Sequence, residues 1–380
     1  MSVIEKRSIQ FIDLAAQQQR LRSGIEKRLL AVLDHGKYIM GPEIAELETL
    51  LADYSGVKHC ISCANGTDAL LMALMAYEVG PGDAVFTTPF TFISTAEVIT
   101  LLGATPVFVD IDKDTYNIDP AAFEVALECY STEGSPLKPR GVIPVDLFGL
   151  AADYNPIEKI AKKHGMFVLE DAAQGFGAVY DGRRAGSFGD VATTSFFPAK
   201  PLGCYGDGGA IFCDDDELAA KLVSIRVHGK GDHKYDNVRI GLNGRLDSMQ
   251  AGVVLEKMTV FDEEIRLRNE VASRYTEALK DHYVTPVIPD GYTSVWAQYS
   301  IQTEDRDGVM AKLKERGVPT AIYYPKPLHI QDAFSYLGYK EEQFPVTMHA
   351  AKRIFSVPMH PYLQGEEQDY IISALLDAVK

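Results

Sequence analysis

Lys200 is the residue of this 380-residue chain best placed for covalent chemistry. It lies in Pro198-Ala199-Lys200-Pro201, between two strand-like runs and just before the glycine-rich stretch Gly203–Gly209. Glycine permits close approach of the backbone. A lysine in such an apolar loop is partly desolvated, which favours the neutral amine that attacks carbonyl groups. Taken alone it would be a surface lysine in a turn, but two further stretches favour the catalytic interpretation.

The first stretch is Glu170-Asp171, which ends a buried-looking strand that starts at Met166. In an α/β sheet, a carboxylate at the carboxyl end of a strand lies where ligands bind. We expect Asp171 to face the ring nitrogen of pyridoxal phosphate and keep it protonated, so that the ring accepts electrons. The alternative is a helix cap for the Ala172-Ala173-Gln174 segment.

The second stretch joins a short strand from His59 to an apolar helix through a tight turn, Asn65-Gly66-Thr67. The start of a helix offers free backbone N–H groups and the positive end of the helix dipole to a phosphate. Ser195, five residues before Lys200, adds a hydroxyl donor. The alternative is an ordinary capped helix.

Together these stretches resemble the DegT/StrS family of nucleotide-sugar aminotransferases. The resemblance rests on Ala64–Leu70, Glu170–Gln174 and Ser195–Lys200, in that order, and covers essentially the whole chain. It implies the α/β fold of type I PLP-dependent aminotransferases. Residues 1–260 would then form an N-terminal helix and a large cofactor domain with a mostly parallel seven-stranded sheet, and residues 261–380 a smaller C-terminal α/β domain.

The resemblance also implies the roles of individual residues. Lys200 would bind the cofactor covalently and act as the catalytic base and acid. Asp171 would pair with the pyridinium, Gln174 with the ring hydroxyl, and an aromatic ring would stack on the cofactor. The implied cofactor-binding residues are Gly66, Thr67, Phe92, Asp171, Gln174, Ser195, Lys200 and, from a partner subunit, Asn243. For Phe92 alone, packing in the core is the simpler interpretation.

A basic segment, Arg226–Arg245, stands out in an acidic protein and indicates an anionic ligand. The family resemblance implies that Asn243 reaches the cofactor phosphate of a neighbouring subunit. Arg245, two residues later, would then lie near the same site and bind a substrate carboxylate. The alternative is an interface salt bridge between Arg245 and Asp247 or a similar acid. Three further substrate-binding candidates, each with a structural alternative, are Tyr38, Tyr324 and His329.

Within the family the chain is most similar to enzymes that aminate the 3-keto group of UDP-2-acetamido-2-deoxy-3-oxo-D-glucuronate. The expected partners are therefore this UDP-sugar and L-glutamate, in a homodimer with shared active sites, in the biosynthesis of bacterial O-antigen. Alternatives are another 3- or 4-keto UDP- or dTDP-sugar, or a non-catalytic regulator on the same fold.

Composition is consistent with this assignment. The net charge of -16 and a pI near 5.0 argue against nucleic acid as a partner. We expect a cytoplasmic protein, because the N-terminus lacks a signal-peptide core and no run could span a bilayer. No metal site is expected.

Strand-like and helix-like runs alternate from His59 to Cys213, which predicts a largely parallel sheet covered by helices. A long helix over 247–280, interrupted near Phe261, should lead into the smaller domain. There we expect strands over 296–302 and 320–324 and a helix over 306–316.

Overall fold

A seven-stranded mixed sheet forms the centre of the fold, in a computed structural model that describes residues 9–131, 134–233 and 235–380. The strand order is β1-β9-β8-β5-β4-β2-β3. Only β9 runs against its two neighbours; the other pairs are parallel. The strands are β1 (His59–Cys63), β2 (Asp83–Thr87), β3 (Thr105–Phe108), β4 (Lys138–Ile143), β5 (Phe167–Asp171), β8 (Val191–Ser195) and β9 (Gly209–Cys213). The predicted mostly parallel sheet is confirmed.

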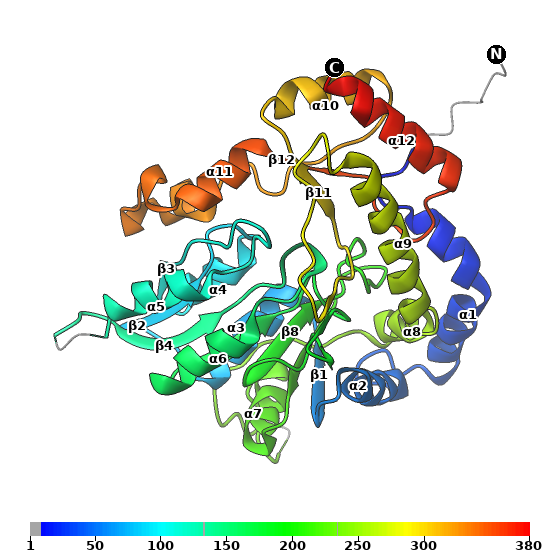
Figure 1. Ribbon diagram of the computed structural model, residues 1–380. Helices are drawn as coiled ribbons and strands as arrows, with labels where there is room; N and C mark the ends of the chain where they lie inside the picture. Colours follow the sequence, from blue (N-terminus) through cyan, green and yellow to red (C-terminus); the bar gives the residue numbers. More distant parts are fainter. Residues whose placement is uncertain (1–8, 132–133, 234) are drawn as a thin grey trace.

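Helices cover both faces of this sheet, because successive strand residues point to opposite sides. Phe86, Val142 and Val168 pack into one hydrophobic cluster, whereas their neighbours in the strands pack into another. The helices of this part are α1 (Leu14–His35), α2 (Pro42–Ser55), α3 (Gly66–Ala76), α4 (Ser94–Leu101), α5 (Pro120–Glu128), α6 (Tyr154–Lys163), α7 (Asp216–Arg226) and α8 (Ser248–Met258). In Figure 1, α1 runs alongside α8 and α9 at one side of the molecule.

The C-terminal elements gather at one end of the molecule around a two-stranded antiparallel sheet (Figure 1). A separate hydrophobic cluster lies between this sheet and its helices. The elements are α9 (Phe261–Leu279), β11 (Tyr299–Gln302), α10 (Arg306–Glu315), α11 (Pro345–Arg353), β12 (Ile354–Val357) and α12 (Gly365–Ala378). The division into domains at 260/261 stays a prediction; it falls between α8 and α9, at the predicted interruption of the long helix.

Short elements complete the fold. A small three-stranded sheet joins β10 (Tyr292–Thr293), β6 (Val179–Tyr180) and β7 (Arg183–Arg184). The 3₁₀ helices are η1 (Leu147–Gly149), η2 (Leu328–Ile330), η3 (Asp332–Leu337) and η4 (Glu341–Gln343). Within the described ranges, no helix combines the length and apolar character needed to cross a bilayer.

The strand predicted over 320–324 is not formed, and this prediction was wrong. The segment makes a single bridge, from Ala321 to Ser356 of β12. Pro325 and Pro327 follow and have no N–H with which to continue a ladder. The predicted strand at 296 starts only at Tyr299, because Trp296 has a φ of 50°, which is not an extended conformation.

The strand directions decide where functional side chains can meet. Since only β9 is reversed, the other six strands have their carboxyl ends at the same edge of the sheet. The segments that follow β1, β2, β5 and β8 hold most of the predicted site residues. Ligands bind at this edge in open α/β sheets.

Candidate active site

The turn after β1 forms the predicted phosphate site. Asn65 caps α3 by accepting a hydrogen bond from the Asp68 backbone N–H at 2.7 Å. This leaves the first N–H groups of the helix, at Gly66 and Thr67, without acceptors within the helix. A Cβ atom on Gly66 would lie 2.6 Å from Cβ of Ser195. Glycine is therefore required here, and its absent side chain brings the helix start against Ser195.

The start of α4 connects this turn to Asp171. The hydroxyls of Thr67 and Ser94 lie 2.8 Å apart, and the next residue, Thr95, donates to Oδ2 of Asp171 at 2.8 Å. Ser94 and Thr95 are both buried. Our sequence analysis missed them, although a Ser-Thr pair at the start of a helix after a strand is a recognisable signal.

Asp171 and Lys200 form the electrostatic centre of the site. Burial raises the pKa of Asp171, while hydrogen bonds from Thr95 and the Ala173 backbone N–H, and the charge of Lys200, oppose that rise. Burial lowers the pKa of Lys200, and the nearby Asp171 carboxylate opposes that shift. The neutral amine is thereby made more accessible at Lys200, as a nucleophile requires.

The Lys200 loop is held by backbone contacts. Lys200 N–H donates to the Phe197 carbonyl at 2.8 Å, and Cys204 N–H donates to the Phe196 carbonyl at 2.7 Å. At Gly203 a Cβ would lie 2.6 Å from the Phe197 carbonyl oxygen, so this tight return of the chain also requires glycine.

Gln174 links the site to the C-terminal part of the chain. Its Oε1 accepts from the Phe148 N–H at 3.1 Å, and its Nε2 donates to the Tyr324 hydroxyl at 3.1 Å. Burial raises the pKa of Tyr324. Tyr324, a predicted substrate-binding residue on the segment between α10 and η2, therefore lies beside a predicted cofactor contact.

The other predicted residues occupy different environments. Phe92 lies in the loop between β2 and α4 and is 55% exposed. That exposure argues against packing in the core. Tyr38 is 49% exposed, and its carbonyl accepts from the Ser248 N–H at the start of α8. His329 is 1% exposed, and its ring centroid lies 4.6 Å from that of Phe344. Neither ring nitrogen has a hydrogen-bond partner among the described residues.

Asn243 and Arg245 lie together near the phosphate turn. Nε of Arg245 donates to Oδ1 of Asn243 at 3.0 Å, and Nη2 donates to the same oxygen. Between them, the Gly244 carbonyl accepts from the Ala64 N–H at 3.0 Å. Asn243 is exposed and Arg245 partly so. Within the described part of the chain, Arg245 and Asp247 of the same subunit form no ion pair.

Comparison with known proteins identifies the family. The model of the DegT/DnrJ/EryC1/StrS aminotransferase family matches residues 19–376. The chain belongs to this family. A UDP-2-acetamido-2-deoxy-3-oxo-D-glucuronate aminotransferase from Pseudomonas aeruginosa is 50% identical over 368 residues, which are 97% of this chain and 99% of that protein.

Two solved structures are closely similar. A DegT/DnrJ/EryC1/StrS aminotransferase from Brucella abortus is 51% identical, with a TM-score of 0.95, and the match covers 98% of this chain and 99% of that one. NtdA from Bacillus subtilis, solved with bound cofactor PMP, is 30% identical with a TM-score of 0.90, covering 100% of this chain and 87% of that one. This chain is a pyridoxal phosphate-dependent sugar-nucleotide aminotransferase, as the sequence predicted.

The residues of this aminotransferase are chemically suited to the cofactor. Gly66, Thr67 and Ser195 present donors for a phosphate, Asp171 a buried acceptor for a protonated ring nitrogen, and Lys200 an amine for an aldehyde. The close contact that only glycine allows at residue 66 brings the start of α3 against Ser195.

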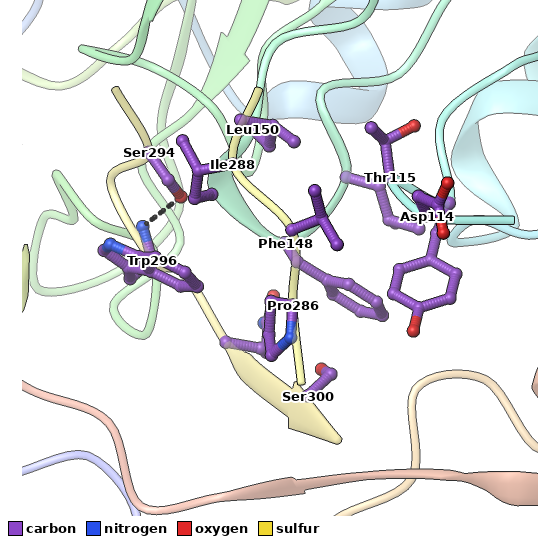
Figure 2. A pocket seen from close by; sticks show the side chains of 13 residues that line it. Asp114, Thr115, Phe148, Leu150, Pro286, Ile288, Ser294, Trp296 and Ser300 are labelled. Atoms are coloured by element: carbon purple, nitrogen blue, oxygen red, sulfur yellow. Dashed lines mark hydrogen bonds between the residues drawn. The ribbon is translucent and has the colours of Figure 1, made fainter. Parts of the chain in front are cut away.

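A separate cavity of about 20 Å³ lies between the large sheet's loops and the C-terminal part (Figure 2). Its lining is mostly apolar and includes Phe148, Leu150, Ile288 and Trp296. Within this lining the backbone N–H of Trp296 donates a hydrogen bond to the Ser294 hydroxyl at 3.0 Å. None of the predicted site residues lines it, so we do not assign the reaction to this cavity.

Proposed function

We propose that this aminotransferase converts UDP-2-acetamido-2-deoxy-3-oxo-D-glucuronate to UDP-2-acetamido-3-amino-2,3-dideoxy-D-glucuronate. L-glutamate would be the amino donor and 2-oxoglutarate the second product. The observation that carries this proposal is the 50% identity, over almost the full length of both chains, to a protein named for that substrate. The partly exposed Arg245 beside Asn243 supplies a cation for a sugar carboxylate. We further propose that the reaction takes place in the cytoplasm, in the biosynthesis of a bacterial O-antigen.

We propose that Gly66, Thr67 and Ser195 bind the cofactor phosphate, and that Phe92 stacks on the ring. When bound, pyridoxal phosphate supplies an electron sink that stabilises negative charge on the carbon losing a proton. Asp171 would hold the proton on the ring nitrogen. Two hydrogen bonds to its carboxylate, from the Thr95 hydroxyl and from the Ala173 backbone N–H, fix the orientation of Asp171.

Gln174 would donate its remaining amide hydrogen to the ring hydroxyl, since its Oε1 is already occupied by the Phe148 N–H. Its bond to Tyr324 supports our proposal that this hydroxyl contacts the substrate. His329 lies buried against Phe344 without a polar partner among the described residues, so we propose for it only an indirect part in shaping the cleft.

Lys200 would move the protons of the reaction. As a neutral amine it can remove the α-proton of L-glutamate, acting as a general base. In the second half-reaction, the protonated amine can deliver a proton to C3 of the sugar, the carbon that receives the nitrogen. Burial lowers the pKa of Lys200, which makes the neutral form more accessible than in an exposed lysine. The two half-reactions share one site, which predicts ping-pong kinetics.

We propose that the active unit is a homodimer. Tyr38, Ile39 and Met40 are 49, 48 and 41% exposed, and Ile240 is 83% exposed. Ile39 pairs with Asp247, which places Ile39 close to Arg245. Contiguous exposed apolar side chains are typical of a surface that a partner covers. Asn243 and Arg245, exposed on the same surface, would then contribute to the partner's site.

The direct test is an amination assay with the purified protein, pyridoxal phosphate and L-glutamate. We expect the 3-amino uronate nucleotide by mass spectrometry, together with an equal amount of 2-oxoglutarate. The matched comparison is the same 3-oxo nucleotide with a CH₂OH group in place of the carboxylate. Faster conversion of the neutral sugar, or of a 4-keto dTDP-sugar, would refute the uronate assignment and leave the family activity intact.

A further inference from the structure

Lys257 is a buried lysine that the proposed chemistry does not use. It lies in the last turn of α8, and the residue is 2% exposed. A buried ammonium group is unfavourable unless it is paired, and lysine is rarely buried without a partner. Among the described residues its ammonium group forms neither an ion pair nor a hydrogen bond, and Glu264 acts on it only at longer range. The position of this cation therefore needs an explanation.

The partner of this ammonium group is an aromatic ring. Nζ of Lys257 lies over the Tyr205 ring, 4.5 Å from its centroid. A cation over the face of an aromatic ring is attracted by the negative charge of the π electrons. Burial lowers the pKa of Lys257 to about 8, and the nearby Glu264 opposes that shift, so the cation predominates at neutral pH. The carboxyl end of α8 favours a cation as well, through the helix dipole.

Gln250, on the same face of α8, holds the backbone of the same tyrosine. It precedes Lys257 by seven residues, which is about two helical turns. Oε1 of Gln250 accepts from the Tyr205 N–H at 2.8 Å, and Nε2 donates to the Tyr205 carbonyl at 3.3 Å. A Cβ on Gly206 would lie 3.0 Å from the same Nε2, so the chain passes close to Gln250. Two side chains of α8 therefore hold both the backbone and the ring of Tyr205.

Tyr205 directly follows the tight loop that carries Lys200. The Cys204 N–H donates to the Phe196 carbonyl at 2.7 Å, and the Phe196 N–H donates to the Gly208 carbonyl at 2.7 Å. The chain on both sides of Tyr205 is thus bonded to Phe196, at the end of β8. These bonds close the base of the loop, and Tyr205 is the residue beside that closure that α8 holds.

We propose that Lys257 is a positioning residue, which together with Gln250 fixes Tyr205 against α8 and so holds the Lys200 amine where it meets the cofactor aldehyde. In that reaction the amine nitrogen forms a bond to the aldehyde carbon, and the aldehyde oxygen leaves as water. A reacting group that is held in the right geometry reacts faster. The start of α8 is itself anchored, because the Ser248 N–H donates to the Tyr38 carbonyl at 2.9 Å. The inference rests on the proposed role of Lys200.

The rate at which the cofactor becomes bonded to lysine tests this positioning. Pyridoxal phosphate is mixed with the apoprotein, and bond formation is followed by absorbance. We expect Lys257→Met, which keeps the length of the side chain and removes its charge, to slow the reaction about tenfold or more. Lys257→Arg keeps a cation that can lie over Tyr205 and should stay within about threefold of the unmodified protein. An unchanged rate in Lys257→Met, or a rate equally low in Lys257→Arg, would overturn the proposal.

Two controls separate positioning from a general loss of structure. Pyridoxine 5′-phosphate has an alcohol in place of the aldehyde, so it cannot bond to lysine, and its affinity should stay within about threefold in every variant because the phosphate contacts remain. Arg184→Met removes a similar contact outside the Lys200 loop, where the guanidinium lies 4.3 Å from the centroid of the Tyr54 ring. Weaker pyridoxine phosphate binding in Lys257→Met, or equal slowing in Arg184→Met, would show a general structural role and refute the positioning role.

Tyr205→Leu provides a second test, which decides even if Lys257→Met does not fold. It removes the ring and keeps an apolar side chain, so we expect the same slowing as in Lys257→Met. The double variant should be no more than about threefold slower than either single variant, because both changes remove one contact. An unchanged rate in Tyr205→Leu, or losses that multiply in the double variant, would contradict the proposal.

Borohydride reduction and peptide mapping of the unmodified protein separate this inference from the proposed function. If the cofactor is bonded to a lysine other than Lys200, the proposed role of Lys200 fails, and the inference that rests on it fails too. If the cofactor is bonded to Lys200 and Lys257→Met reacts at the normal rate, only the positioning role of Lys257 fails. Cofactor on Lys200 together with slowing that Lys257→Arg reverses is the result that we expect.

Discussion

Replacing Arg245 with alanine should separate a uronate substrate from a neutral one. The Arg245 side chain is partly exposed, and its Nε and Nη2 donate to Oδ1 of Asn243. The other N–H groups of Arg245 donate no hydrogen bond to any of the described residues. A carboxylate on the sugar could take two of these donors in parallel, which a lysine side chain cannot offer.

The magnitude follows from the number and burial of these bonds. A hydrogen bond to a charged group contributes about 1.5–3 kcal/mol when it is shielded from water. Arg245 is only partly exposed in the single chain, and we propose that a partner subunit covers it. We therefore expect Arg245→Ala to lose about 1.5–3 kcal/mol of transition-state stabilisation with the uronate, a decrease in kcat/KM of about 10- to 150-fold.

The assay measures kcat/KM for the 3-oxo uronate nucleotide and for its neutral CH₂OH analogue, with the same enzyme preparations. The neutral substrate should lose less than about threefold in Arg245→Ala, and Arg245→Lys should recover only part of the uronate activity. Equal losses on both substrates would refute carboxylate recognition. A loss that accompanies dissociation in sedimentation experiments would assign Arg245 to assembly instead.

Asp171→Asn keeps the size of the side chain but removes the charge that we propose holds the ring proton, so kcat should fall by about two orders of magnitude or more while the thermal unfolding temperature changes little; near-normal turnover would show that the acid is a cap. Inactive Lys200→Ala and Asn243→Ala subunits should regain activity when mixed, provided the sites are shared, whereas a fully active monomer in sedimentation would exclude sharing. Because burial raises the pKa of Glu170 in the folded state, the free energy of unfolding should fall as pH rises from about 4.5 through the folded pKa. That fall should be smaller in Glu170→Gln, as measured by urea unfolding at several pH values, and an unchanged slope would contradict the raised pKa of Glu170.

The periodic parts of the chain were predictable because local rules determine them. Alternation of strands and helices indicated the large sheet, and Asn65-Gly66-Thr67 marked the start of α3. Thr320–Tyr324 was not predictable in this way. Its β-branched and aromatic residues favour a strand, but the prolines that follow have no N–H with which to continue a ladder. The hydrogen bond from Gln174 to Tyr324 holds the segment beside Gln174 instead.

The contacts between distant segments account for what the sequence analysis missed. Thr95 and Asp171 are 76 residues apart, and no local pattern relates them. The same holds for Asp146, which appears in the sequence as one acid after a strand and whose N–H donates to the Asp171 carbonyl in the fold. The Glu170-Asp171 pair was noticed for its second member alone, because alternation along β5 sends the two carboxyl groups to opposite faces.

Reduction of the holoenzyme with borohydride, followed by peptide mapping, tests the central claim most directly. Borohydride fixes the cofactor on the amine to which it is bound. We predict one modified peptide, carrying the cofactor on Lys200, and no modification in Lys200→Ala, which should still bind the cofactor through the phosphate contacts at Gly66, Thr67 and Ser195. Modification of a different lysine, or an unmodified Lys200 in protein that binds the cofactor, would contradict the site described above.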